Sequence, residues 1–341
     1  MARRAGVSIK TVSRVLNNEP NVRPVKRQQV LEAARALNYS PNISARSLAG
    51  DKSFLIALLY RDPSLDPSPN YISYVQIGAL AKCRQYGFYL LLEPYDMHDP
   101  DVENEVQRLI IRSRVDGLIL IPPISDSDAI MRAIEASGLP YVRIAPGDEP
   151  DRAPHVFMDD RQAAYDMTEH LLKLGHRRIG FIKAHLDHGA AQFRLEGFQT
   201  AMAEHNVPVD PPLVGQGDFT VESGMRCTEA FLDLPTPPTA VFAANDEMAA
   251  GAIAAAHKRG LAVPADLCVS GFDDSSVAAV TWPPLTTVHQ PIAEMAEAAT
   301  ELLIERIKGH KSDETGDRFP SRQLDYRIVV RDSTATAPAE A

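Results

Sequence analysis

The spacing of hydrophobic and polar positions changes along this chain. In about the first forty residues, apolar side chains recur three and four positions apart, which is typical of short amphipathic helices. From residue 54 onward, nearly continuous apolar runs of strand length alternate with longer helical segments. The pattern therefore predicts a small helical head followed by a larger α/β body.

Three short helices are predicted in the head. Gly6 ends the first, Ser8 is suited to cap the second, and the third begins at about Pro24, whose fixed φ suits a first helical turn. The apolar positions expected to pack together are Val12, Val15 and Leu16 of the second helix and Val30, Ala34 and Leu37 of the third. A helix, a tight turn, a second helix and a bracing helix make a helix-turn-helix unit.

The polar face of the second helix has the residues that a DNA-reading helix needs. Lys10, Ser13, Arg14 and Asn17 lie at i, i+3, i+4 and i+7, opposite the apolar face. In a helix-turn-helix unit this helix enters the major groove, where such side chains reach base edges and phosphates. An amphipathic helix alone is more often an ordinary surface helix, so the charge distribution has to support the interpretation.

Charge is distributed unevenly between the two parts. Residues 1–50 contain nine Lys or Arg and two acidic residues, a net +7, whereas the whole chain of 341 residues has a net charge of −10. A basic head on an acidic body indicates that only the head meets a polyanion. A solvated basic tail is disfavoured because the head also has apolar periodicity and turn residues.

The body is predicted to form two doubly wound lobes. Near-continuous apolar strands that alternate with helices are typical of parallel sheets covered on both faces. Ligands of such folds bind beyond the carboxyl ends of the strands, so the expected site is the cleft between the lobes. The expected strands are residues 54–60, 88–95, 117–123 and 141–146 in the first series, and 178–184, 240–245 and 268–274 in the second.

Composition and motifs narrow the class of protein. The cysteines Cys83, Cys227 and Cys268 are scattered, which indicates free thiols and neither a disulfide framework nor a zinc site. No signal peptide and no run of membrane-spanning length is present, so a cytoplasmic protein without membrane contact is expected. No nucleophile elbow, P-loop or zinc-protease motif occurs. His185 and His188 are expected on a polar rim, in a loop that can reach the ligand because it precedes Arg194. We therefore expect no enzyme, no cofactor and no metal.

Two segments resemble a known family. "RRAGVSIKTVSRVLNN" and "VLEAARALNYSPNISARSLAG" are similar to the DNA-binding head of the lactose-repressor (LacI/GalR) family, and the resemblance extends over nearly the whole chain. It implies that Ile9, Lys10 and Arg14 read bases, and that residues 41–50 form a hinge helix whose Leu48 wedges into the minor groove. From the residues alone, a plain linker is an equally good interpretation of this segment. The expected DNA-contacting residues are Ser8, Ile9, Lys10, Thr11, Ser13, Arg14, Asn17, Asn42, Ala45 and Leu48.

The family also implies an effector domain similar to periplasmic sugar-binding proteins, in which each lobe is discontinuous. The expected divisions are a head at 1–40, a hinge at 41–53, an effector and dimerisation domain at 54–332 and a disordered tail at 333–341. Lobe one is expected at 54–153 and 285–315, and lobe two at 154–284 and 316–332. Relatives have more residues before the position of Met1, so we expect the natural chain to begin upstream.

The effector-binding residues are expected at strand ends and in loops. In the family, the positions of Arg194, Asp273 and Phe219 hold the ligand through a guanidinium, a carboxylate and an aromatic face. The full expected set is Asn70, Tyr71, Ser125, Asp160, Arg194, Phe219, Asn245, Asp273 and Gln290. Alternatives without a ligand stay open for some of these residues and their neighbours. Asp160, Asp246 and Asp274 could be helix N-caps, Phe219 could belong to the hydrophobic core of its lobe, and Asp160 and Gln290 could have a structural role.

These observations predict a ligand-responsive transcriptional regulator, a repressor of carbohydrate-utilisation genes that a sugar effector releases. A homodimer on a near-palindromic operator is expected, and the C-terminus has no leucine heptad that would make a tetramer. The alternatives are a body that senses a partner protein, or a solute-binding protein for sugar transport.

Overall fold

The computed structural model describes residues 1–16, 22–37, 39, 52–65, 69–185, 187–309 and 319–337. It divides into two compact units, Met1–Phe54 and Leu55–Ala341, which are treated separately below. Four of the expected DNA-contacting residues lie outside the described residues: Asn17, Asn42, Ala45 and Leu48.

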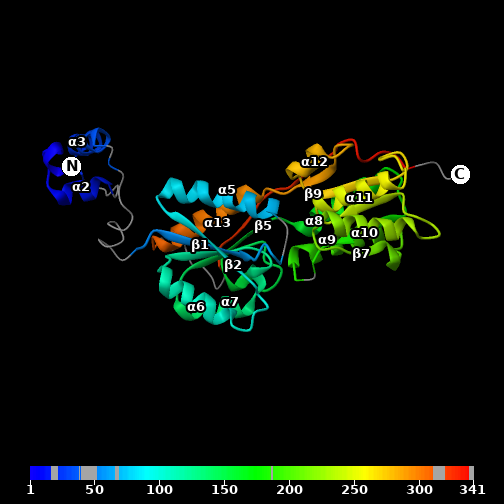
Figure 1. Cartoon of the computed structure of the whole chain (residues 1–341), viewed down its shortest axis with the longest axis horizontal. Helices are drawn as coiled ribbons and strands as arrows, with labels where there is room; N and C mark the ends of the chain where they lie inside the picture. The colour runs from blue at the N-terminus through cyan, green and yellow to red at the C-terminus, as the bar shows by residue number, and fades with distance from the viewer. Residues whose placement is uncertain are drawn as a thin grey trace. The chain divides into compact units, whose positions relative to one another are not determined.

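The first unit is a three-helix head (Figure 1). Its helices are Ala2–Ala5 (α1), Ile9–Leu16 (α2) and Pro24–Ala36 (α3). Gly6 ends α1 in the left-handed conformation with φ 63°, and the Ser8 hydroxyl accepts a hydrogen bond from the Thr11 backbone N–H at 3.2 Å. A small core joins the helices through Ala5, Val15, Val30 and Ala33. Leu37 is 45% exposed, so our expectation that it packs into this core was wrong: α3 ends one residue earlier.

The second unit contains two six-stranded sheets. The strands of the first are Leu55–Arg61 (β1), Tyr89–Tyr95 (β2), Gly117–Leu120 (β3), Tyr141–Ile144 (β4), His155–Phe157 (β5) and Ser321–Gln323 (β11). The strands of the second are Ile179–Lys183 (β6), Val214–Gln216 (β7), Ala240–Ala243 (β8), Cys268–Asp273 (β9), Thr286–His289 (β10) and Arg327–Val329 (β12). Each of the seven predicted strands is confirmed, and the five others were missed.

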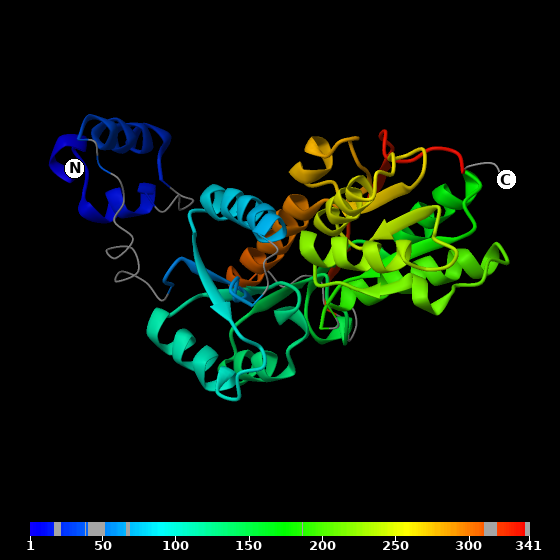
Figure 2. The same cartoon turned by 45° about the vertical axis from the view of Figure 1, so that its right-hand side comes forward.

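Helices cover both faces of each sheet (Figures 1 and 2). They are Pro69–Tyr86 (α5), Val102–Ser113 (α6), Asp128–Ser137 (α7), Asp160–Lys173 (α8), Gly189–Glu204 (α9), Val221–Leu232 (α10), Asp246–Lys258 (α11), Ser276–Val280 (α12) and Ile292–Ile307 (α13). On the first sheet α5 packs with α13 and α6 with α7; on the second, α8 packs with α9 and α10 with α11.

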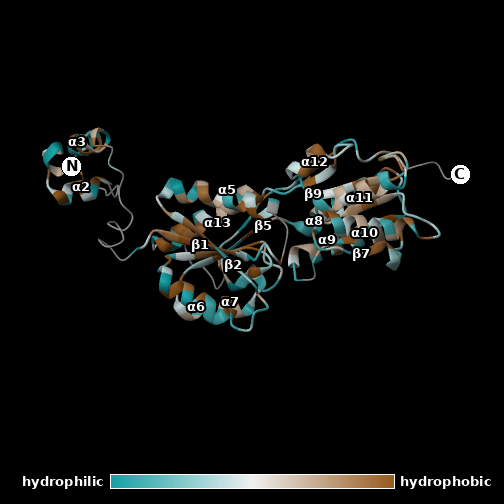
Figure 3. Cartoon of the chain, viewed as in Figure 1, coloured by the Kyte–Doolittle hydropathy of each residue, from teal (hydrophilic) through white to brown (hydrophobic). Residues whose placement is uncertain are grey.

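Strand order explains why the apolar runs are continuous. The first sheet runs β11-β5-β4-β3-β1-β2, and its pairs are all parallel; the second runs β12-β10-β9-β8-β6-β7, with only the β10–β12 pair antiparallel. The central strand β3 is buried along its whole length, and β1 is brown, or hydrophobic, in Figure 3. A strand covered on both faces needs apolar side chains at successive positions, because both sides lie in a core.

The lobe boundaries differ from the expected ones in three places. β5 and β11 pair with each other in the first sheet, although residues 154–284 and 316–332 were expected in lobe two. β10 belongs to the second sheet, where it pairs with β9 and β12, although residues 285–315 were expected in lobe one. The short strands β5 and β11 leave no periodic signal in the sequence, which explains the error. The chain thus crosses between the lobes after β5, after β10 and after β11.

The expected disordered tail is also corrected where the structure describes it. Ser333 is fully buried, and its hydroxyl accepts from the Thr286 backbone N–H at 2.8 Å and donates to the Val269 carbonyl at 2.6 Å. The Ala335 carbonyl lies 3.1 Å from Nε2 of the buried His176. Residues 333–337 therefore pack on the second lobe. No helix of the described residues has the length and apolar character needed to cross a membrane.

Candidate ligand pocket and DNA-binding surface

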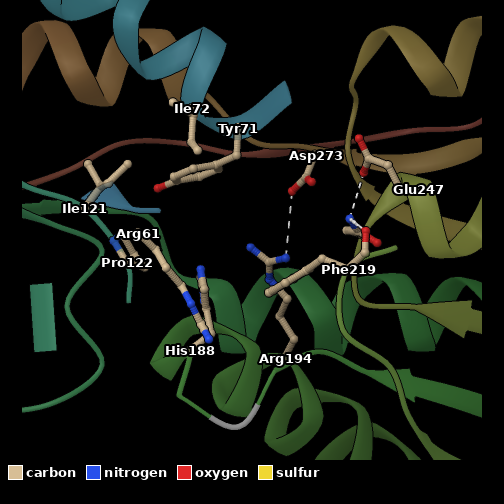
Figure 4. A pocket seen from close by; sticks show the side chains of 11 residues that line it. Arg61, Tyr71, Ile72, Ile121, Pro122, His188, Arg194, Phe219, Glu247 and Asp273 are labelled. Carbon is tan, nitrogen blue, oxygen red and sulfur yellow. Dashed lines mark hydrogen bonds and ion pairs between the residues drawn. The ribbon is translucent and has the colours of Figure 1, made fainter. Parts of the chain in front are cut away.

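A small cavity of about 40 Å³ lies between the two lobes (Figure 4). Its lining residues are Arg61, Tyr71, Ile72, Ile121 and Pro122 from the first lobe, and His188, Arg194, Phe219, Asn245, Glu247 and Asp273 from the second. The cavity has room for water-sized molecules, so a larger ligand needs side chains or lobes to move.

The fold brings these residues together because they follow the carboxyl ends of parallel strands. Arg61 ends β1, Ile121 follows β3, and Tyr71 lies in the first turn of α5. On the second lobe, Asp273 ends β9 and Asn245 caps α11 directly after β8. This edge of a doubly wound sheet is where ligands bind, and here two such edges face each other.

Arg194 is a buried cation that the protein holds on several sides. Its Nε donates to Asp160 Oδ1 at 2.8 Å, its Nη1 to the Ala244 carbonyl at 2.6 Å and its Nη2 to Gln290 Oε1 at 3.3 Å. Its guanidinium also lies 3.7 Å from the centre of the Phe272 ring. These contacts fix the guanidinium plane, so its remaining N–H groups point to defined places in the cavity.

Two lining residues adopt backbone conformations that are unfavourable for L side chains. Asp273 has φ 115° and Phe219 has φ 68°. Each such residue costs about 1–3 kcal/mol, and such residues are typical of ligand sites. Burial raises the pKa of Asp273 well above its usual range, although Nη1 of Arg194, 3.8 Å from its Oδ1, opposes this shift.

The Asn245 side chain is largely engaged by the protein itself. Its Oδ1 accepts from the Met248 N–H at 2.9 Å, and its Nδ2 donates to the Phe219 carbonyl at 3.1 Å and to Glu247 Oε2 at 2.7 Å. Asn245 therefore caps α11, orients the loop that carries Phe219 and directs the Glu247 carboxylate toward the cavity.

Three buried polar atoms on the cavity wall have no hydrogen-bond partner in the described part of the chain: Arg61 Nε, Tyr71 Oη and His188 Nδ1. Burial, together with the nearby cations Arg194 and Arg61, lowers the pKa of His188 to about 3, so its imidazole is neutral. Burial and the nearby carboxylate of Asp160 raise the pKa of Tyr71, so its hydroxyl keeps its proton. These groups can therefore donate or accept hydrogen bonds to a bound molecule.

Five of the nine expected effector-binding residues line the cavity: Tyr71, Arg194, Phe219, Asn245 and Asp273. Asp160 and Gln290 lie behind Arg194 and hold it. Asn70 donates a hydrogen bond to Glu247 across the lobes. Ser125 is fully buried outside the lining, where its carbonyl accepts from Arg143 Nε at 2.7 Å.

The helix N-caps and the position of Phe219 decide two of the alternatives without a ligand. The caps of α8, α11 and α12 are Asp159, Asn245 and Ser275, so Asp160, Asp246 and Asp274 are not N-caps. Phe219 is 7% exposed and also lines the cavity, where its ring makes an edge contact with His188 at 5.0 Å between centroids.

Five lining residues were not predicted from the sequence: Arg61, Ile72, Ile121, Pro122 and Glu247. A sixth, His188, was expected on a polar rim. The sequence does contain a signal for three of them, because lining residues follow strand ends. Arg61 and Pro122 end or follow apolar runs of strand length, and Glu247 is two residues from Asn245. For Ile72 no sequence signal distinguishes a lining residue from the helix core.

On the head, α2 exposes the expected base-reading side. Ser8, Ile9, Lys10, Ser13 and Arg14 are exposed, and the apolar Val15 is buried beneath them. Ile9 is 81% exposed, which is unusual for an isoleucine in a packed unit. An exposed apolar residue beside two cations suits a groove surface, where apolar atoms contact thymine methyl groups and cations reach guanine or phosphate.

Comparison with known proteins relates both parts to transcriptional regulators. Residues 1–42 match the family described as bacterial regulatory proteins, lacI family, and residues 168–334 match the periplasmic binding protein-like domain. The HTH-type transcriptional repressor CytR of Escherichia coli (strain K12) is 34% identical over 339 residues, which cover 99% of this chain and 96% of that protein.

Solved structures of regulators are similar over nearly the whole chain. A lac repressor dimer bound to operator and the anti-inducer ONPF is similar with a TM-score of 0.79 and 28% identity, over 98% of this chain and 97% of that one. The transcriptional regulator CelR–cellobiose complex is similar with a TM-score of 0.75 and 29% identity, over 97% of this chain and 98% of that one.

Proposed function

The chain belongs to the LacI family of bacterial regulatory proteins, and from this premise we propose that it represses carbohydrate-utilisation genes until a sugar effector binds between its lobes. One observation carries the proposal: a chain with an exposed DNA-reading helix also encloses an inter-lobe cavity whose wall holds unpartnered polar atoms. Effectors named for similar structures include cellobiose, and that complex supports a sugar as the ligand class.

We propose two roles for six of the nine expected residues. Asp273, Arg194 and Tyr71 contact the effector directly, while Asp160 and Gln290 keep Arg194 in place. Carboxylate, guanidinium and hydroxyl groups at fixed positions suit the hydroxyl groups of a sugar. The Phe219 ring, next to them on the wall, supplies the apolar surface on which a sugar ring packs.

The structure suggests how binding reaches the rest of the molecule. Gln290, which bonds to Arg194, lies in the segment where the chain crosses from β10 to α13. Asp274, next to Asp273, contacts His289 of β10 at 3.0 Å and accepts from Arg331 after β12. Contacts in the cavity therefore act directly on crossing segments, whose backbone angles set the angle between the lobes.

We propose that the functional species is a homodimer on a near-palindromic operator, as the lac repressor dimer on its operator supports. The body exposes apolar side chains suited to an interface: Ile77 on α5, Tyr89 and Leu92 on β2, and Val280 and Trp282 at the end of α12. We take these residues as the candidates for the dimer interface, because an interface buries exposed apolar side chains.

Selection of DNA by the purified protein, followed by fluorescence anisotropy, tests this function. An inverted repeat should be enriched and bound at least a thousandfold more tightly than random duplex at moderate salt. Binding should weaken in Arg14→Ala, while Gln199→Ala, exposed on α9 of the body, serves as the control. Equal affinity for selected and random DNA would contradict the proposal.

A sugar panel then tests the effector. At least one mono- or disaccharide should raise the melting temperature and change operator affinity, and Asp273→Asn should abolish both responses. If no sugar does so while operator binding stays intact, a partner protein becomes the better candidate for the signal.

A further inference from the structure

Arg61 is a nearly buried cation whose Nε has no hydrogen-bond partner in the described part of the chain. Its side chain is 11% exposed, and its one ion pair among the described residues joins Nη1 to Asp187 Oδ2 at 3.8 Å, beyond hydrogen-bond distance. A guanidinium has five N–H donors, and its Nε is buried without a partner. A cation taken out of water in this way needs an acceptor.

Two other buried arginines of the body show how the chain normally satisfies such a group. Arg194 donates from Nε, Nη1 and Nη2 to three different residues. Arg143 is fully buried and donates to Asp126 and to the carbonyls of Ser125, Asp148 and Glu149. Arg61 differs from both, and it is the one of the three that ends a strand at the first-lobe wall of the cavity.

The unpartnered atoms of Tyr71 and His188 lie on the wall of the same cavity. In Figure 4, the Tyr71 hydroxyl, Arg61 and His188 lie toward the side of Ile121 and Pro122, and Asp273 and Glu247 lie toward the other side. Leaving a buried donor without a hydrogen-bond acceptor destabilises the protein, so a ligand that supplies the acceptor gains affinity. Among the residues that the structure describes, the other buried side-chain atoms without a hydrogen-bond partner are hydroxyls of Ser125, Thr228, Ser270 and Ser275, none of which lines the cavity.

We propose that Arg61, Tyr71 and His188 bind a carboxylate group of the effector, so that the effector is a sugar acid. A guanidinium pairs with a carboxylate through two parallel N–H···O bonds, and the Tyr71 hydroxyl and an Nδ1-protonated His188 add two neutral donors. On the opposite side, Asp273 and Glu247 accept hydrogen bonds from hydroxyl groups. One side of the cavity thus donates hydrogen bonds to a carboxylate, and the other side accepts hydrogen bonds from hydroxyl groups.

A carboxylate fits this subsite better than a phosphate. One guanidinium, whose charge is partly balanced by Asp187, matches a single negative charge. Asp187 is held in turn by His98 of the first lobe, whose Nε2 lies 2.8 Å from Asp187 Oδ2. A doubly charged phosphate would add a second negative charge to a cavity whose wall already holds the carboxylates of Asp273 and Glu247. This inference rests on the proposed function, because it assumes that a sugar-like effector occupies the cavity.

Calorimetric titration with matched pairs of probes tests the inference. The pairs are D-glucose and D-glucuronate, D-galactose and D-galacturonate, and D-glucitol and D-gluconate, with D-glucose 6-phosphate as the phosphate arm. At least one acid should bind roughly tenfold or more tightly than its neutral partner. If no acid exceeds its neutral partner, or if the phosphate binds more tightly than the acids, the inference is wrong.

Variants identify the group responsible. Arg61→Gln should lower affinity for the preferred acid roughly ten- to hundredfold and leave the neutral partner within about twofold. Asp187→Asn should raise acid affinity, because it removes the carboxylate that competes for Arg61, whereas a purely structural ion pair predicts a loss in both variants. Arg112→Gln, which removes an exposed charge from α6, is the matched control, and circular dichroism verifies folding.

The two levels of the proposal can fail separately. Operator selection needs no effector, and a response to any sugar, neutral or acidic, supports the proposed function. A protein that binds its operator and responds only to neutral sugars would refute the carboxylate subsite alone.

Discussion

At the scale of single residues, the site depends on buried charges whose partners come from distant parts of the chain. Arg194 and Asp160 are each less than 5% exposed in their side chains and share a hydrogen bond of 2.8 Å. Burial raises the pKa of Asp160 from its ordinary value, and Arg194 opposes this shift. Removing either partner leaves the other as an uncompensated buried charge.

We expect Arg194→Gln to lower the free energy of unfolding by about 3–5 kcal/mol. The double variant Asp160→Asn/Arg194→Gln should lose less than the sum of the single variants, because the charge of Asp160 is then not left unpaired when Arg194 is removed. Urea denaturation of the three proteins measures this. The control is Arg161→Gln, which breaks an exposed ion pair between α8 and α9 and should cost at most about 1 kcal/mol. Additive losses would show that the two residues act independently.

Asp246 makes stability depend on pH. Burial raises its pKa to about 7, although the Thr287 hydroxyl and the Ser275 N–H, at 2.6 and 2.7 Å, stabilise the ionised form. The folded protein then holds this proton up to about pH 7, whereas the unfolded chain releases it near pH 4. Because the folded state binds more protons in this interval, stability should fall as pH rises from about 4 to 7.

Replacing Asp246 by Asn tests whether this carboxyl group makes stability fall as pH rises. An amide can donate to the Thr287 hydroxyl and accept from Ser275, so the network is kept while the titration is removed. Unfolding free energies measured at pH 5, 6, 7 and 8 should decline less steeply in Asp246→Asn than in the parent. Asp151→Asn, at an exposed carboxylate, should leave the slope unchanged. An equal slope in the parent and in Asp246→Asn would exclude Asp246 as the cause.

At the scale of elements, the lobes meet where two backbones touch. A Cβ built on Gly189, the first residue of α9, would lie 2.2 Å from the Cα of Gly147, which follows β4 in the other lobe. A Cβ on Gly147 would lie 2.3 Å from the Cα of Gly189. Neither distance is possible for real atoms, and backbone atoms on both sides leave little freedom to adjust. This closed arrangement of the lobes therefore requires glycine at both positions.

We expect Gly189→Ala and Gly147→Ala to shift the protein toward an open arrangement. The added methyl group penalises the closed arrangement and leaves the separate lobes intact, so effector affinity should fall about tenfold or more. Small-angle scattering should show a larger radius of gyration for both variants, with little change in melting temperature. Unchanged scattering and affinity in both would mean that the lobes close without this contact.

At the scale of the whole molecule, exposed apolar residues point to self-association. Ile77 on α5 is 61% exposed, and Trp282, which follows α12, is 81% exposed. α12 itself is largely brown, or hydrophobic, in Figure 3. One residue lies on the first lobe and the other on the second, so an interface that covered both would respond to the angle between the lobes.

We expect Ile77→Asp and Trp282→Asp each to weaken the dimer more than tenfold, because each would place an unpaired charge in an apolar interface. Sedimentation velocity over a concentration series measures the change. Gln199→Asp adds the same charge at an exposed position on α9 and should leave the dimer unchanged. If Ile77→Asp and Trp282→Asp sediment like the parent, the interface lies elsewhere.

The comparison of sequence and structure separates local from long-range information. Apolar runs and turn residues predicted α2, α3 and seven strands correctly, because helix periodicity and burial on both faces leave a mark in neighbouring residues. The three-residue strands β5 and β11 were missed, and β10 was assigned to the wrong lobe. Their membership depends on pairing with strands far away in the chain, which leaves no local pattern.

The sequence by itself determined the helix-turn-helix head, the α/β body and five of the residues that line the cavity. Only the tertiary structure decided that Asp160 and Gln290 hold Arg194, and that Nε of Arg61 lies at the cavity without a hydrogen-bond partner among the described residues. The physical reason is that amphipathic spacing is a property of adjacent residues. Whether a buried charge is satisfied depends instead on atoms that folding brings together from segments far apart in the chain: Arg194 and Asp160 are 34 positions apart, and Arg194 and Gln290 are 96.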